Sequence, residues 1–294
     1  MYTYTLVKED PNSHPIVPSS DIPLWKALTS ELIGTFALVF IGCSAGALAV
    51  TQGGTLLGTA FAFGLVLMTM IYILGSYSGS LFNPAIAFGF ALSGRMNWGI
   101  MLLYWIVQLI AGIAAAALVV YFFGSATGVG ASVGSLTYTN QWGAVLAEMI
   151  ATFVLVITVL LVTRNPMLSV VTGIAIGLVL TFDILAIGTL TGGSMNPARS
   201  LGPAIFSDNM SSYWIYIVGP LLGALLAALF YRLFTYDWNC CDKVDECGNP
   251  VLDECGRKIK ECKVPLVDNC GRKIECKIRG PCGKLIKDCD CPPR

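Results

Sequence analysis

One tripeptide occurs twice in this chain, as Asn83-Pro84-Ala85 and Asn196-Pro197-Ala198, and it constrains the fold more than any other feature. In each copy Asn stands where a helix N-cap belongs, and Pro stands at the first helical position, which needs no N–H. The apolar stretches that follow reach only to about residues 92 and 206. At 1.5 Å per residue, roughly ten residues cover about 15 Å, half of a ~30 Å hydrocarbon core. The sequence therefore predicts two half-spanning helices.

The composition is that of a polytopic membrane protein. Hydrophobic residues make up 55% of the 294, charged residues only 12%, and the mean hydropathy is +0.71. Six apolar stretches are long enough to cross a bilayer. They cover about residues 25–50, 56–76, 99–123, 142–163, 168–190 and 213–235. We expect an all-α membrane protein with six transmembrane helices and two half-spanning helices.

The chain also contains an internal repeat. The run that begins Glu31-Leu-Ile-Gly-Thr35-Phe36 recurs 117 residues later as Glu148-Met-Ile-Ala-Thr152-Phe153, and the two tripeptides lie 113 residues apart. Each copy, about 25–123 and about 142–236, holds three spans and one half-helix. Because three is odd, the second copy enters the membrane from the other side. The repeat is therefore inverted, and the half-helices should meet near the midplane.

Three segments differ in composition. Residues 1–24 lack an apolar h-region, so we expect no cleaved signal peptide. Residues 25–236 form the expected membrane domain, and residues 237–294 form a polar tail with ten of the eleven Cys. The Lys and Arg residues of the short connections fall on the same side of the membrane as the tail, and the positive-inside rule assigns that side to the cytoplasm. Both termini should therefore be cytoplasmic.

The duplicated motif has an electrostatic consequence. Two facing helix N-termini bring together roughly half an elementary charge each, so a cation or hydronium at that place is repelled. The side-chain oxygens of Asn83 and Asn196 act as caps, which leaves their NH₂ groups to donate to water in a lumen. The alternative is that both asparagines are caps and nothing more.

Several stretches around the motifs resemble the aquaporin, or major intrinsic protein, family over about residues 25–235. They are the two tripeptides with Arg199, Gln108, the repeated Glu pattern, Gly192-Gly193-Ser194-Met195, and Ser200-Leu201-Gly202-Pro203-Ala204. The resemblance implies a passive channel in a lipid bilayer, selective for water and small neutral solutes and assembled as a homotetramer. It implies no catalysis, no cofactor or metal, and no nucleic-acid partner.

The resemblance also implies a selectivity filter formed by Phe63, Ile184, Gly193 and Arg199. Arg199 has five donors and a permanent charge, so it can bind a hydroxyl and repel a cation. An alternative role for Arg199 is a structural ion pair. Strict water channels of the family usually have His where this chain has Ile184. The filter should therefore be wide and partly apolar, which suits glycerol.

Other positions favour water alone. Glycerol channels of the family usually have Asp directly after the Arg and a basic residue four positions later, whereas this chain has Ser200 and Ala204, as water channels do. Tyr216 fits the water type and Ile217 the solute type. Leu81 stands where many members have His, which argues against pH gating there. We expect a channel for water and glycerol or similar solutes, with a water-only channel as the alternative.

Three acidic residues lie within predicted spans. Glu31 and Glu148 would each cost about 2.5–3.5 kcal/mol at mid-span unless their oxygens are satisfied. As in the family, they should accept N–H groups from the two half-helix loops, with Gln108 beside them. The alternative is hydrogen bonding between helices elsewhere. For Asp183 we expect a buried, hydrogen-bonded carboxyl rather than a pore charge.

The tail has its own pattern, with Cys pairs at 255 and 262, 270 and 276, and 282 and 289. On the cytosolic side these Cys should be free thiols or metal ligands rather than disulfides. A basic, disordered appendage is the other interpretation, and Cys240 and Cys241 are candidates for S-palmitoylation.

Two other classes of protein remain open. An ion-coupled secondary transporter also uses inverted repeats and broken helices, but this chain lacks a relay of acidic residues. A non-conducting scaffold would use the Cys-rich tail as its working part.

Overall fold

The computed structural model describes residues 22–235 and, within the tail, residues 240–242, 260–262, 266–267 and 273–274. The chain divides into two compact units, residues 1–235 and 236–294, which we describe separately. The expectations for residues 1–21 and for most of the Cys pairs of the tail lie outside the described residues, and so do the side chains of Cys240 and Cys241.

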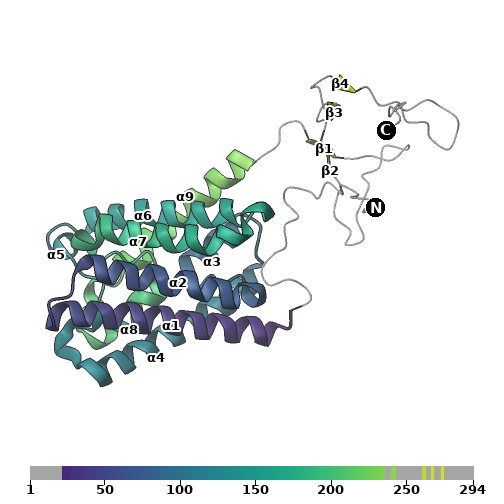
Figure 1. Cartoon of the computed structure of the whole chain (residues 1–294). Coiled ribbons are helices and arrows are strands. Elements are labelled where there is room, and N and C mark those ends of the chain that lie inside the picture. The colour runs from purple at the N-terminus through teal and green to yellow at the C-terminus, as the bar shows by residue number, and fades with distance from the viewer. Residues whose placement is uncertain (1–21, 236–239, 243–259, 263–265, 268–272, 275–294) are drawn as a thin grey trace, which may run out of the picture. The chain divides into compact units, whose positions relative to one another are not determined.

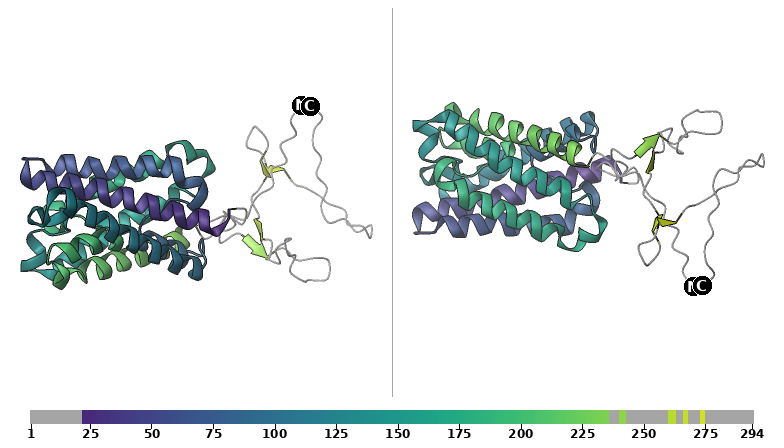
Figure 2. Two further views of the ribbon diagram at one scale, coloured as in Figure 1. Left: turned by 90° about the horizontal axis from the view of Figure 1, so that it is seen from below. Right: turned by 90° about the horizontal axis from the view of Figure 1, so that it is seen from above.

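Six helices of the first unit are long and apolar enough to cross a membrane. They are α1 (Leu24–Thr51), α2 (Leu56–Ser78), α4 (Trp98–Phe123), α6 (Gln141–Val162), α7 (Thr172–Thr191) and α9 (Ile215–Thr235). They pack side by side in one bundle (Figure 1), and two further views show the same bundle from below and above (Figure 2). The six predicted spans are confirmed.

Two short helices complete the bundle, α3 (Pro84–Leu92) and α8 (Pro197–Phe206). Asn83 caps α3 by accepting a hydrogen bond from Ala85 N at 2.8 Å. Asn196 caps α8 in the same way, from Ala198 N at 3.0 Å. Both caps satisfy donors that a helix N-terminus otherwise leaves unpaired. The order of two long helices, a short helix and a long helix occurs twice, and the predicted fold class is confirmed.

The connections are more structured than the hydropathy suggests. The span expected at 168–190 agrees with the apolar stretch Met167–Thr191, which begins in the 3₁₀ helix η2 (Pro166–Val171) and continues as the α-helix from Thr172. The loop at 124–140 contains η1 (Ser125–Gly130) and α5 (Ser135–Thr139), and η3 (Met210–Ser212) precedes α9. Hydrophobicity reports which residues avoid water and not which hydrogen-bond pattern the backbone adopts.

Glycines bring the helices together within this one chain. A Cβ on Gly177 of α7 would lie 2.6 Å from Gly64 O of α2, and one on Gly223 of α9 would lie 2.4 Å from Met149 O of α6. Real Cβ atoms do not approach a carbonyl so closely, so each contact requires glycine. These glycines are thus used inside the subunit, and they supply no argument for a tetramer.

The described part of the tail forms two short antiparallel ladders, which the sequence analysis did not expect. β1 (Cys240–Asp242) pairs with β2 (Lys260–Cys262), and β3 (Leu266–Val267) pairs with β4 (Lys273–Ile274).

Candidate functional site

The two loops that lead into α3 and α8 have the same unusual backbone. Gly79 and Gly192 end α2 and α7 in the left-handed conformation, with φ of 80° and 85°. Phe82 and Met195, which directly precede the capping asparagines, also have positive φ, 49° and 52°. A non-glycine residue there costs on the order of 1–3 kcal/mol and persists only when its surroundings hold it.

Glu31 of α1 holds the first loop. Its Oε1 accepts from the Ser78 hydroxyl at 2.7 Å and from Leu81 N at 3.0 Å. Its Oε2 accepts from Phe82 N at 2.7 Å and from Gln108 Nε2 at 2.8 Å. The carboxyl group is fully buried, and its four donors satisfy it.

Glu148 of α6 holds the second loop in a matching way. Its Oε1 accepts from the Thr191 hydroxyl at 2.7 Å and from Ser194 N at 2.9 Å, and its Oε2 accepts from Met195 N at 2.6 Å. This carboxyl has three described donors, one fewer than Glu31, since no amide side chain takes the place of Gln108 among the described residues. Each repeat therefore fixes its half-helix loop with a buried carboxyl.

The two asparagines also bind across the repeats. Asn83 Nδ2 donates to Met195 O, and Asn196 Nδ2 donates to Phe82 O, both at 2.9 Å. An amide nitrogen carries two hydrogens. One N–H of each asparagine is therefore used between the loops, and the prediction that the NH₂ groups donate to water in a lumen concerns the one N–H that remains on each.

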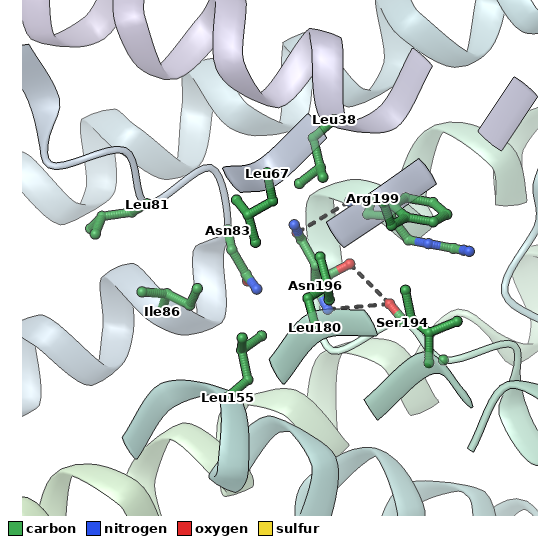
Figure 3. A pocket seen from close by; sticks show the side chains of 13 residues that line it. Leu38, Leu67, Leu81, Asn83, Ile86, Leu155, Leu180, Ser194, Asn196 and Arg199 are labelled. Atoms are coloured by element: carbon green, nitrogen blue, oxygen red, sulfur yellow. Dashed lines mark hydrogen bonds between the residues drawn. The ribbon is translucent and has the colours of Figure 1, made fainter. Parts of the chain in front are cut away.

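A narrow cavity of about 20 Å³, room for a water molecule, passes these asparagines. The candidate filter residues Phe63, Ile184, Gly193 and Arg199 all line it. Figure 3 shows the cavity with Asn83, Asn196 and Arg199 labelled among its lining side chains. The remaining lining residues are Leu38, Leu67, Leu81, Ile86, Leu155, Leu180 and Ser194. The cavity is therefore walled by apolar side chains, aliphatic ones and Phe63, with its polar groups confined to the two loops and Arg199.

Arg199 lies in the first turn of α8 and is 5% exposed. Its guanidinium carbon is 4.8 Å from the ring centroid of Phe63, a cation–π arrangement. Its Nη1 donates to the hydroxyl of Ser132, so its partner is a neutral group rather than the carboxylate of the ion-pair alternative. Gly193 gives the loop no side chain and lies against Ile184, whose Cα would be 3.1 Å from an added Cβ.

Sequence reasoning gave no role to two buried polar residues. Ser132 comes from the stretch between the repeats, and its position in the glycine-rich run 128–134 was the available signal. Arg95 is one of the basic residues of the short connections that indicated the orientation, yet it is buried. Its Nη1 donates to Leu160 O at 2.9 Å, and its guanidinium lies 4.8 Å from the Phe90 ring, so it joins the end of α3 to the end of α6.

Asp183 corrects a sequence-based expectation. The residue is buried, as expected, but its Oδ2 has no hydrogen-bond partner within the described part of the chain. It does not line the cavity described above. Its position on α7, next to Ile184 along the helix but turned by about 100°, places it off the pore.

Comparisons with known proteins show the family and the fold of this chain. The family model for "Major intrinsic protein" matches residues 19–231. Aquaporin NIP1-1 of Zea mays is 34% identical over 73% of this chain and 77% of its own length. Probable aquaporin TIP2-2 of Oryza sativa subsp. japonica is 39% identical over 70% of this chain and 86% of its own. The X-ray structure of the aquaglyceroporin from Plasmodium falciparum has a TM-score of 0.63 at 23% identity, covering 71% of this chain and 96% of that one.

The fold and the site together define a passive membrane channel rather than an enzyme, built from two inverted halves around a narrow pore. Within that class, the chain belongs to the major intrinsic protein family, the family of the aquaporins.

Proposed function

We propose that this channel conducts water together with glycerol or similar small uncharged solutes, and that it excludes protons and other cations. The composition of the candidate filter supports the conduction of solutes. An apolar wall, formed at Phe63, Ile184 and Gly193, lies beside a single charged group, Arg199. A carbon backbone can lie against the apolar side chains while its hydroxyls accept hydrogen bonds from the guanidinium.

Cation exclusion rests on charge. α3 and α8 begin at Asn83 and Asn196, whose loops are hydrogen-bonded to each other, so two positive helix ends lie beside the cavity. Arg199 adds a permanent positive charge on the same path. In a cavity walled by apolar groups, such charges are screened less than in water, and a cation that enters must lose hydration without gaining an anionic ligand.

We infer that both termini are cytoplasmic and that the chain forms a homotetramer. Arg95 and Arg232 lie at the same end of the bundle, since Arg232 Nη2 is 3.9 Å from the Cβ position of Gly94. Arg95 also contacts Thr163, next to Arg164. The basic residues of the short connections thus cluster at one end, which supports the assigned orientation. The tetramer rests on family membership alone, and cross-linking of the protein in membranes tests it.

Proteoliposomes test the function. After an impermeant osmotic step, vesicles with the protein should shrink many times faster than empty vesicles, and after a glycerol step they should re-swell. Neither rate should change when a sodium or proton gradient is imposed, and a pH-sensitive dye inside the vesicles should report no added proton leak. Dependence on an ion gradient would indicate a coupled transporter. Fast shrinkage without re-swelling would indicate a water-only channel. Shrinkage no faster than that of empty vesicles would indicate a non-conducting scaffold.

A further inference from the structure

Three serine hydroxyls connect Arg199 to the loop of the second motif. Arg199 Nη1 donates to Ser132 Oγ. The hydroxyl oxygens of Ser132 and Ser200 are 2.5 Å apart, as are those of Ser200 and Ser194. Ser194 Oγ then donates to Asn196 O at 3.0 Å. All three serines are buried, with at most 4% of their surface exposed.

The two ends of this chain of hydroxyls fix its direction. A guanidinium N–H can only donate, and a carbonyl oxygen can only accept, while each hydroxyl has a single hydrogen to give. Ser132 therefore donates to Ser200, Ser200 donates to Ser194, and Ser194 donates to the carbonyl of Asn196. Each hydroxyl hydrogen has its acceptor within the chain, so the loss of one serine leaves a buried neighbour unpaired.

Ser132 reaches Arg199 from a separate, tightly held segment. A Cβ on Gly192 would lie 2.7 Å from Ser132 Cα, and one on Gly130 would lie 2.5 Å from Cys43 O of α1. Both glycines also have positive φ, 85° and 63°. The segment 130–134 is therefore fixed between α1 and the start of the second loop, and the Ser132 hydroxyl is presented to the guanidinium in one place.

We propose that Ser132 is a positioning residue of the selectivity filter, which acts through Arg199. The chain of hydroxyls holds the guanidinium against segment 130–134 and over Phe63, and so keeps open the cross-section beside Ile184. This inference rests on the proposed solute conduction. Without the Ser132 hydroxyl, the Nη1 hydrogen loses its protein acceptor and turns to pore water. The guanidinium then narrows the pore. Water molecules in single file still pass, whereas a wider polyol is slowed.

The experiment is a double-mutant cycle with two readouts. The unmodified protein, Ser132→Ala, Arg199→Ala and the double variant are compared for the glycerol-to-water flux ratio in the same vesicles, and for the unfolding midpoint in detergent. Ser132→Ala should lower the flux ratio by roughly fivefold, the effect of one ordinary hydrogen bond. In the Arg199→Ala background the same substitution should leave the ratio unchanged, and the two changes should be non-additive in the unfolding midpoint.

Two further variants separate positioning from packing. Ser132→Thr keeps the hydroxyl and should restore most of the flux ratio. Ser44→Ala removes a buried hydroxyl that has no hydrogen-bond partner among the described residues, and it should leave the ratio as in the unmodified protein.

The experiment separates failure of the positioning role from failure of the proposed solute conduction. If Ser132→Ala lowers the glycerol-to-water flux ratio equally with and without Arg199, Ser132 acts without Arg199, and the positioning role is overturned. Coupling in the unfolding midpoint with an unchanged flux ratio also overturns the positioning role. If the unmodified protein conducts no glycerol, the proposed function fails. The unfolding cycle then still decides, because additive changes there show that the hydroxyl chain does not link the two residues.

Discussion

Asn83 and Asn196 bind each other's loops. The Nδ2 atom of each lies 2.9 Å from the carbonyl oxygen of the residue that precedes the other, Met195 or Phe82. The same two side chains cap α3 and α8 through their oxygens. The two repeats are thus joined at the point where both half-helices begin. A change in the conformation of one loop therefore alters the hydrogen bonds of the other.

Arg199→Val should raise cation or proton leak while water flux persists. The substitution removes the permanent charge beside the cavity and leaves both half-helices in place. Two unit charges 4 Å apart interact by about 4 kcal/mol at an effective dielectric constant of about 20. Loss of even part of this repulsion should raise the cation leak roughly tenfold. Dye-loaded vesicles measure it against the conservative Arg199→Lys. An unchanged leak would remove Arg199 from cation exclusion.

Ile184→His should lower glycerol flux much more than water flux. The imidazole occupies cross-section beside Gly193, and a polyol needs that space whereas single-file water does not. We expect a loss in glycerol flux of roughly tenfold, with water flux reduced about twofold or less, consistent with the size of pocket discrimination by shape. Ile184→Val, which keeps the wall apolar, is the control. A proportional loss of both fluxes contradicts the wide filter.

Glu31→Gln should destabilise the protein more than Glu148→Gln. The amide retains one oxygen and turns its NH₂ group toward the donors of the other, which are two at either oxygen of Glu31 but only one at Oε2 of Glu148. Each unpaired buried donor costs about 1–3 kcal/mol, so a loss of about 3 kcal/mol is expected for Glu31→Gln. The unfolding midpoint in detergent gives the order, and the reverse order would show that Gln108 contributes little.

Gly112→Ala should destabilise the protein by roughly 1–3 kcal/mol and lower the water flux per channel. The added Cβ would lie 2.3 Å from Ala198 O, so α4 must push α8 away together with Arg199. Gly58→Ala, at an exposed position of α2, is the matched control, since its nearest neighbour, Thr55 Oγ1, is 3.7 Å away. That variant should be as stable or up to about 1 kcal/mol more stable. Equal effects would mean that the α4–α8 contact can relax.

Deletion of residues 243–294 should leave the permeability per channel intact. All of the pore-lining residues and both loop-holding carboxyls lie within residues 31–199. Flux divided by the amount of reconstituted protein measures the effect. A large loss at equal reconstitution would assign the tail a role in gating.

The sequence by itself determined the architecture of this protein. Span number followed from apolar length, and both half-helices followed from Asn and Pro at their first positions, because capping and the φ of proline act within a few residues. The ends of α3 and α8 agree with the expected residues 92 and 206. The 117-residue and 113-residue offsets predicted the inverted repeat, which needs no knowledge of side-chain contacts.

Only the tertiary structure decided which polar groups find partners. Ser132 and Arg199 are 67 residues apart, and Asn83 and Met195 are 112 apart, so no local pattern encodes either hydrogen bond. Asp183, expected to be paired, has an oxygen without a described partner. In a low-dielectric interior each buried polar group must be satisfied by whatever the packing brings near it. That depends on the simultaneous placement of several helices, which hydropathy and spacing do not specify.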